Sequence, residues 1–201
     1  MKNLWLMICA SLLFAACGGA GTNTGTNTSA VLEEPKLTYT LNGKSGPVDP
    51  KAGYYATGSI ATLIEVNGKS EPGKIPRYTF YFANFKLDKD NIFKSMTSPE
   101  QVRVLFVLEG VPGGDENTPL KAGTYPAKAP PGTPNYDSHG TAIFVVENGK
   151  EKDYRAERVK YGNTIGEVKI TSVEGDKVTG EIDINVDNQM ALKGNFTATK
   201  K

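Results

Sequence analysis

Short segments in which apolar and polar residues alternate follow one another along most of the chain and predict β-strands. From Ala56 to Val66, every second side chain would lie on one face of such a strand. The segment Val102–Leu108 is almost continuously apolar, which is typical of a central strand covered on both faces. Further strands are predicted at Leu37–Leu41, Tyr78–Ala83, Thr141–Glu147, Asp153–Lys160, Ile165–Val173, Val178–Val186 and Met190–Thr199.

The turn residues between these segments favour antiparallel hairpins. Asn-Gly, the preferred dipeptide of a two-residue hairpin turn, occurs at Asn42–Gly43, Asn67–Gly68 and Asn148–Gly149. The last two strands would form a hairpin around Asp187–Asn188. Helix signals are scarce, and Ser98–Gln101 is expected to form one helical turn at most. We therefore predict an all-β fold, an antiparallel β-sandwich or flattened barrel of about nine or ten strands with little helix.

The N-terminal segment differs from the rest of the chain. A short positive segment, Met1–Asn3, precedes an apolar run of eleven residues, Leu4–Phe14, in which Ser11 is polar. As a helix these residues would reach only about 16 Å, whereas the hydrocarbon core of a bilayer is roughly 30 Å thick. This pattern is typical of a signal peptide and not of a permanent membrane span.

The end of this segment, Ala15-Ala16-Cys17, resembles the lipobox of bacterial lipoproteins. The resemblance implies that Cys17 receives a diacylglyceryl thioether and that the chain is cut just before it. The usual box has Leu three positions before the cysteine, whereas this chain has Phe14 there and Leu13 one place further out. The alternative is an ordinary signal peptide cut after Ala16, with Cys17 unmodified.

A flexible tether is predicted after Cys17. Residues 18–30 are all Gly, Ala, Thr, Asn or Ser, a composition that cannot bury enough surface to fold. As a coil, residues 18–34 would span roughly 20–25 Å. The predicted organisation is a signal peptide over 1–16, a lipidated Cys17 with its tether over 17–34, and a β-sandwich over 35–201. Gly18–Gly19 resembles outer-membrane sorting in enterobacterial lipoproteins, so we expect a bacterial envelope location at the outer membrane, on its periplasmic or surface face.

Composition narrows the function classes. The chain has 23 basic and 22 acidic residues, one His and two Cys among 201 residues. Loss of Lys2 with the signal peptide would leave the charges balanced, and a nucleic-acid-binding domain usually needs a clear basic excess. We expect no nucleic-acid partner, no cofactor and no enzymatic activity.

Asp137-Ser138-His139 contains the residue types of a hydrolase triad, but neighbouring side chains on a strand point to opposite faces. A hydrolase using Asp153 and Glu157 is the remaining enzymatic alternative.

The longest irregular segment of the predicted domain is a candidate binding site. Residues 126–136 contain four prolines, which favour an extended polyproline conformation, and two tyrosines flank the prolines. Exposed tyrosines make good contacts because they are large and amphipathic. The candidate binding residues are Tyr125, Pro130, Pro131 and Tyr136; the alternative is a passive connection between strands.

A carboxylate-rich strand offers an alternative site. Glu181, Asp183 and Asp187 alternate with apolar residues and would share one strand face, where their oxygens suit Ca²⁺. The same alternation describes the solvated face of an amphipathic strand. We therefore predict no metal, with these three carboxylates as the alternative.

Two further segments resemble motifs of exported bacterial β-sandwich proteins of unknown function. Pro119–Tyr125 is similar to their turn-to-strand motif, and Val178–Ile182 with Leu192–Ala198 resembles their closing hairpin. The resemblance implies a fold and a location but carries no catalytic residue. We expect a lipid-anchored, non-enzymatic binding, adhesive or structural module with an envelope or host protein or a glycan as partner. The alternative is a carrier that encloses a small apolar ligand in a β-barrel cavity.

Overall fold

A computed structural model describes residues 36–48, 53–127, 137–155, 164–186 and 189–201. Several predictions fall outside these ranges: the signal peptide, Cys17 and its tether, Glu157, Asp187, and the loop residues Pro130, Pro131 and Tyr136. They stay predictions.

The described chain consists of strands and their connections, without a helix, which confirms the all-β prediction. The segment Ser98–Gln101 forms a turn, in which the Gln101 amide donates to the Ser98 carbonyl at 3.0 Å, and not a helical turn. The strands are β1 (Leu37–Leu41), β2 (Lys44–Val48), β3 (Tyr54–Val66), β4 (Lys69–Ala83), β5 (Val102–Glu109), β6 (Gly123–Pro126), β7 (Asp137–Glu147), β8 (Lys150–Arg155), β9 (Thr164–Glu174), β10 (Lys177–Val186) and β11 (Met190–Lys200).

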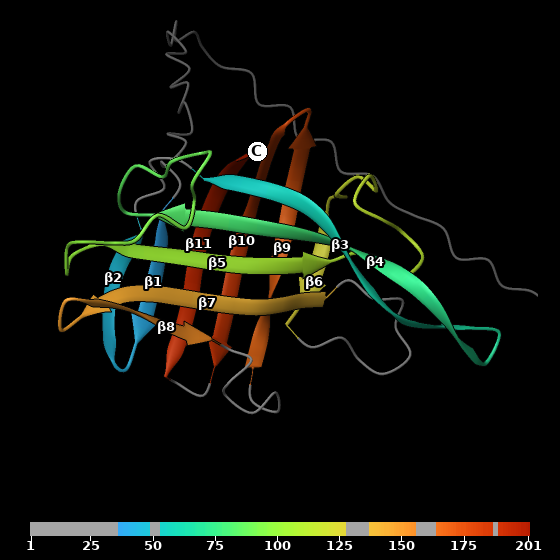
Figure 1. Cartoon of the computed structure of the whole chain (residues 1–201), viewed down its shortest axis with the longest axis horizontal. Coiled ribbons are helices and arrows are strands. Elements are labelled where there is room, and N and C mark those ends of the chain that lie inside the picture. The colour runs from blue at the N-terminus through green and yellow to red at the C-terminus, as the bar shows by residue number, and fades with distance from the viewer. Residues whose placement is uncertain (1–35, 49–52, 128–136, 156–163, 187–188) are drawn as a thin grey trace, which may run out of the picture. The chain divides into compact units, whose positions relative to one another are not determined.

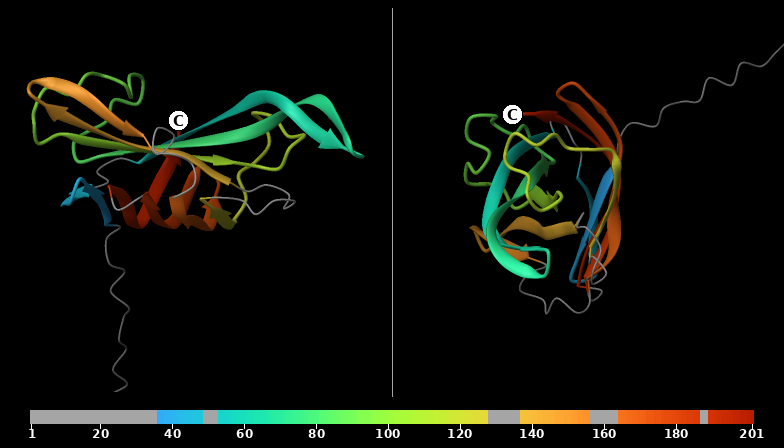
Figure 2. Two further views of the ribbon diagram at one scale, coloured as in Figure 1. Left: turned by 90° about the horizontal axis from the view of Figure 1, so that it is seen from below. Right: turned by 90° about the vertical axis from the view of Figure 1, so that its right-hand side faces the viewer.

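These strands form one mostly antiparallel sheet that folds over itself into two layers. Its order is β6-β9-β10-β11-β3-β4-β5-β7-β8, and the β1–β2 hairpin pairs with β11 beside this path. One layer holds β6, β9, β10, β11 and the hairpin, and the strands of the other layer run across them (Figures 1 and 2). The layers join where β11 meets β3 in a short parallel contact, at Thr199–Tyr54 and Lys200–Tyr55. The sheet is sandwich-like and is not closed into a barrel.

The three predicted Asn-Gly hairpin turns are confirmed. Asn42, Asn67 and Asn148 have φ of 50°, 52° and 53°, and the glycine after each also has a positive φ. A two-residue hairpin turn with both residues in the left-handed region matches the twist of the strands it connects. These turns connect β1 to β2, β3 to β4, and β7 to β8.

An aromatic cluster fills the space between the layers. Phe80 of β4 stacks on Phe106 of β5 with ring centroids 4.7 Å apart. Phe196 of β11 meets the rings of Phe80, Phe82 and Phe106 edge-on at 5.2–5.6 Å. Its neighbour on β10 is Gly180, where a Cβ atom would lie 2.6 Å from the Phe196 ring. A glycine is therefore required here to make room for the aromatic ring.

The outer face of β5 and β7 is covered by the long β4–β5 connection, residues 84–101. Arg103 lies beneath this connection with 1% of its surface exposed. Its Nη1 donates to the carbonyls of Ile92 and Lys94 at 3.0 and 3.2 Å, and its Nη2 pairs with Glu151 at 2.5 Å. The guanidinium also lies 4.8 Å from the centre of the Phe144 ring. Both faces of the predicted central strand are thus covered, as its continuous apolar sequence indicated.

Replacing Arg103 should loosen the β4–β5 connection, residues 84–101, from the outer face of β5 and β7. Burial lowers the pKa of Arg103 while Glu151 opposes that shift, but an arginine remains charged at neutral pH. In Arg103→Met, the Ile92 and Lys94 carbonyls lose their donor, so we expect a loss of about 2–4 kcal/mol in urea unfolding. Trypsin should also cleave within residues 84–101 earlier than in the native protein.

Arg155→Met is the matched control. Arg155 pairs with Asp153 and also approaches the Phe144 ring, but 43% of its side chain is exposed. Exposed ion pairs contribute less than about 1 kcal/mol. Equal losses for the two variants would contradict the structural role given to Arg103.

Candidate functional site

Tyr125 lies in the core and not on the surface. It sits on β6 opposite Val168 of β9, with 1% of its surface exposed. Its hydroxyl donates to the Lys121 carbonyl at 2.9 Å, which satisfies the polar end of the ring. This burial corrects the expectation that Tyr125 offers its ring to a partner, and it removes Tyr125 from the candidate surface.

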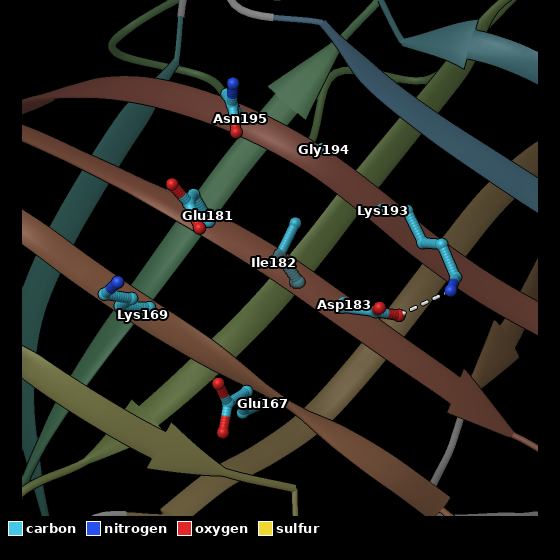
Figure 3. Close-up of a pocket in the computed structure, with 8 residues that line it drawn as sticks. All are labelled: Glu167, Lys169, Glu181, Ile182, Asp183, Lys193, Gly194 and Asn195. Atoms are coloured by element: carbon cyan, nitrogen blue, oxygen red, sulfur yellow. Dashed lines mark ion pairs between the residues drawn. The ribbon is translucent and has the colours of Figure 1, made fainter.

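Glu181 and Asp183 lie on the outer face of β10, as the alternation predicted (Figure 3). Asp183 forms an exposed ion pair with Lys193 of β11 at 2.8 Å. Glu181 stands between Lys169 of β9 and Asn195 of β11 in the strand register. Side chains of the three strands line a shallow hollow of about 230 Å³.

This face carries both signs of charge and is open to solvent. Within the described residues, no three His, Cys, Asp or Glu side chains gather closely enough to hold a metal ion. Asp187, the third residue of the alternative metal site, lies outside the described residues. The observed pairing fits the solvated face of an amphipathic strand, which was the other interpretation of this pattern.

The β3–β4 hairpin forms a second candidate surface. Its two strands pair from Tyr54–Tyr81 to Val66–Lys69, but β5 accompanies β4 only from Arg77 onward. The remaining part, Ser59–Pro76, projects beyond the layer as a two-stranded arm (Figure 2, left panel). At its end, Leu63 is 67% exposed and Val66 is 37% exposed. These exposed apolar side chains are available for contact with another polypeptide.

The outer edge of β3 lacks a neighbouring strand over most of its length. In the described structure β11 reaches only Tyr54 and Tyr55, and the chain continues with Lys201, whose amide donates to the Tyr55 carbonyl at 2.8 Å. Backbone groups alternate in direction along a paired strand. Residues 57, 59, 61, 63 and 65 therefore direct their N–H and C=O groups to the same side as Tyr55. This edge, Ala56–Val66, is the longest strand edge without a neighbouring strand in the described ranges.

In contrast, the opposite edge of the arm, formed by β4, is not available for strand pairing. Pro72 and Pro76 interrupt β4 at positions that face outward, so these positions have no N–H to offer. The carbonyls of Lys74 and Pro76 accept hydrogen bonds from Gly113 and Gly110 at 2.8 and 2.9 Å. One edge of the arm is therefore blocked by prolines and a loop, and the other has no neighbouring strand among the described residues.

Polar contacts hold that loop on the arm. Ser59 of β3 donates to the Glu116 carboxylate at 2.8 Å, and Lys74 of β4 pairs with the same carboxylate at 3.5 Å. A hydrogen bond from its own backbone, followed by those contacts with Ser59 and Lys74, lowers the pKa of Glu116. These contacts join the loop to both strands of the arm.

The described structure offers little space for an enclosed apolar ligand. The aromatic cluster occupies the space between the layers, and the sheet is open. A cleft of about 160 Å³ lies at one end of the layers, lined by Leu41, Met190, Tyr154 and neighbouring polar residues. The carrier alternative stays a prediction.

Sequence reasoning located β3 and its turn but missed the arm. The segment between Gly68 and Tyr78 contains Pro72 and Pro76 and few apolar residues, so it was not predicted as a strand. The available signal was the Asn67–Gly68 turn, which requires a second strand after it. Prolines confined to that second strand further indicate which edge of the hairpin is blocked.

Comparisons with known proteins add no relative: no family model, curated protein or solved structure matches this chain. Across the described residues, no helix has the length and apolar character needed to cross a membrane.

The ion pair on the outer face of β10 should contribute little to stability. Asp183 and Lys193 are both more than half exposed, so we expect Asp183→Asn to change the free energy of unfolding by less than about 1 kcal/mol. Urea unfolding measures this change, with Lys193→Met as the companion variant. A loss of several kcal/mol in either variant would contradict the description of this face as solvated.

Proposed function

We propose that this protein is a lipid-anchored bacterial envelope protein whose β-domain binds other polypeptides without catalysing a reaction, through the β3–β4 arm. The open edge of β3 beside exposed Leu63 is the observation that carries this proposal. An exposed strand edge can add a strand from another polypeptide, with backbone hydrogen bonds supplying affinity and alternate side chains supplying specificity. The occupied edge of β4 restricts such an addition to one side of the arm.

The proposed anchor depends on Cys17 and the sequence before it. Ala15-Ala16-Cys17 resembles a lipobox, and the composition of residues 18–34 would let the domain stand clear of the lipid headgroups. A single acyl chain binds a membrane only marginally, whereas several chains anchor a protein stably. The expected location remains the outer membrane, on its periplasmic or surface face.

Cys17→Ala tests the anchor directly. We expect the full-length variant, expressed in a bacterial host, to move from the membrane pellet to the soluble fraction, because it has no thiol to acylate. Mass spectrometry of the native N-terminus should find an acylated Cys17. A variant that stays in the membrane pellet would contradict lipid anchoring through this residue.

Photo-crosslinking in cells tests the arm. In the full-length chain, we expect benzoylphenylalanine at Leu63 to form adducts with polypeptides, because this position lies at the open edge of the arm. The same residue at Lys150 is the control, since Lys150 is also exposed but lies on β8, an edge strand with five charged residues. Equal adducts at both positions, or none at Leu63, would contradict the proposal.

A further inference from the structure

We propose that the polypeptide bound by the arm is a second copy of this chain, whose β3 edge pairs antiparallel with the first about a two-fold axis at Ala61. This inference rests on the proposed function, because it names the partner of the same open edge. The result would be a sheet that continues from one copy to the other through β4–β3–β3–β4. Two-fold pairing uses the same surface on both copies, so that surface must complement itself.

The backbone of β3 meets this requirement. When Ala61 lies opposite Ala61, Ser59 lies opposite Leu63, and Thr57 lies opposite Glu65. All of these are odd-numbered positions, whose N–H and C=O groups face the open edge. An antiparallel ladder forms its hydrogen bonds between pairs of this kind, which here gives about ten bonds across the interface. In this register every residue from Ala56 to Val66 lies opposite a residue of the other copy, because Ala56 lies opposite Val66 at each end.

The side chains complement each other in the same register. On the even-numbered face, Ile64 of one copy lies opposite Gly58 of the other, and a Cβ atom built at Gly58 would have no neighbour within 4 Å. Ile60 lies opposite Thr62, a pair of β-branched residues that suits a strand. On the other face, the exposed Leu63 would cover Ser59 and thereby lose contact with water.

Charge favours the pairing as well. Glu65 is the single charged residue between Ala56 and Val66, and it lies opposite Thr57 in this register. Like charges directly opposite one another destabilise paired strands, and here none meet. The edge thus lacks the lysines, prolines and bulges by which strand edges usually avoid pairing.

Other terminal strands of the described sheet show those protections. Strand β8 has five charged residues among its six, β6 is four residues long and ends at Pro126, and β2 is five residues long and contains Pro47. Charges, prolines or short length protect these edges, whereas the longest edge in the described residues, that of β3, has no such protection. This contrast favours pairing at β3. The self-complementary register is what favours a second copy over an unrelated strand.

Disulfide formation in membranes containing the full-length protein tests this register. In Ala61→Cys, the two cysteines would face each other with Cα atoms about 5.5 Å apart, which is within disulfide range. The matched control is Thr62→Cys, one residue away and also exposed, whose two copies would lie beyond about 7 Å and could not bridge. Under mild oxidation we expect roughly tenfold more disulfide dimer from Ala61→Cys than from Thr62→Cys.

A mixing experiment checks the register independently. Chains carrying Ser59→Cys and chains carrying Leu63→Cys should form a disulfide dimer when expressed together, and little dimer when either is expressed alone. The native chain under the same oxidation measures any contribution from Cys9 and Cys17, and thermal unfolding confirms that each variant is folded.

Each result separates this inference from the proposed function. Equal dimer from Ala61→Cys and Thr62→Cys, or none from either, overturns pairing about Ala61. If the crosslinker at Leu63 then still captures a different polypeptide, the second copy is excluded while the binding role of the arm stands. If it captures none, both proposals fail.

Discussion

The contact of Phe196 with the aromatic rings of the opposite layer is the interaction on which the rest of the structure depends. Phe196 belongs to β11, whereas Phe80, Phe82 and Phe106 belong to β4 and β5. Burial of aromatic side chains supplies a large share of core stability, and edge-to-face contacts add to it. Because β11 and β3 pair at only two positions, backbone hydrogen bonds alone join the layers weakly, and side-chain packing must hold them together.

The projecting arm is a consequence of the same arrangement. Strand β3 leaves β11 after Tyr55, because the two strands run parallel and β11 ends at Lys200, opposite Tyr55. Strand β4 then turns one face to the core from Tyr78 to Phe82, while its first half extends beyond β5. The hairpin is therefore anchored firmly at its base and unsupported at its end. Within the described residues, the long edge of β3 without a neighbouring strand thus results from the way in which the two layers join.

The fold class could be predicted from the sequence because strands and hairpin turns are specified by residues that lie close together in the chain. The Asn42–Gly43 and Asn67–Gly68 turns require positive φ at both positions, and the alternation around Phe80 requires one buried face. The core position of Tyr125 could not be predicted in this way. It depends on β6 lying against β9, strands about forty residues apart in the chain, and on the Lys121 carbonyl accepting its hydroxyl. Strand pairings of this kind are set by packing of the whole sheet, which a periodic pattern does not contain.

In the proposed assembly, the anchor and the strand edge act together. A two-strand contact at the end of an arm is small, and a small interface binds weakly when its partners diffuse in three dimensions. Attachment of both copies to one membrane raises their effective concentration, and a flexible tether allows the arms to meet without fixing their orientation. The β3 edge that would promote aggregation of a protein in free solution can then work as a specific contact between anchored copies, because pairing occupies this edge in both copies.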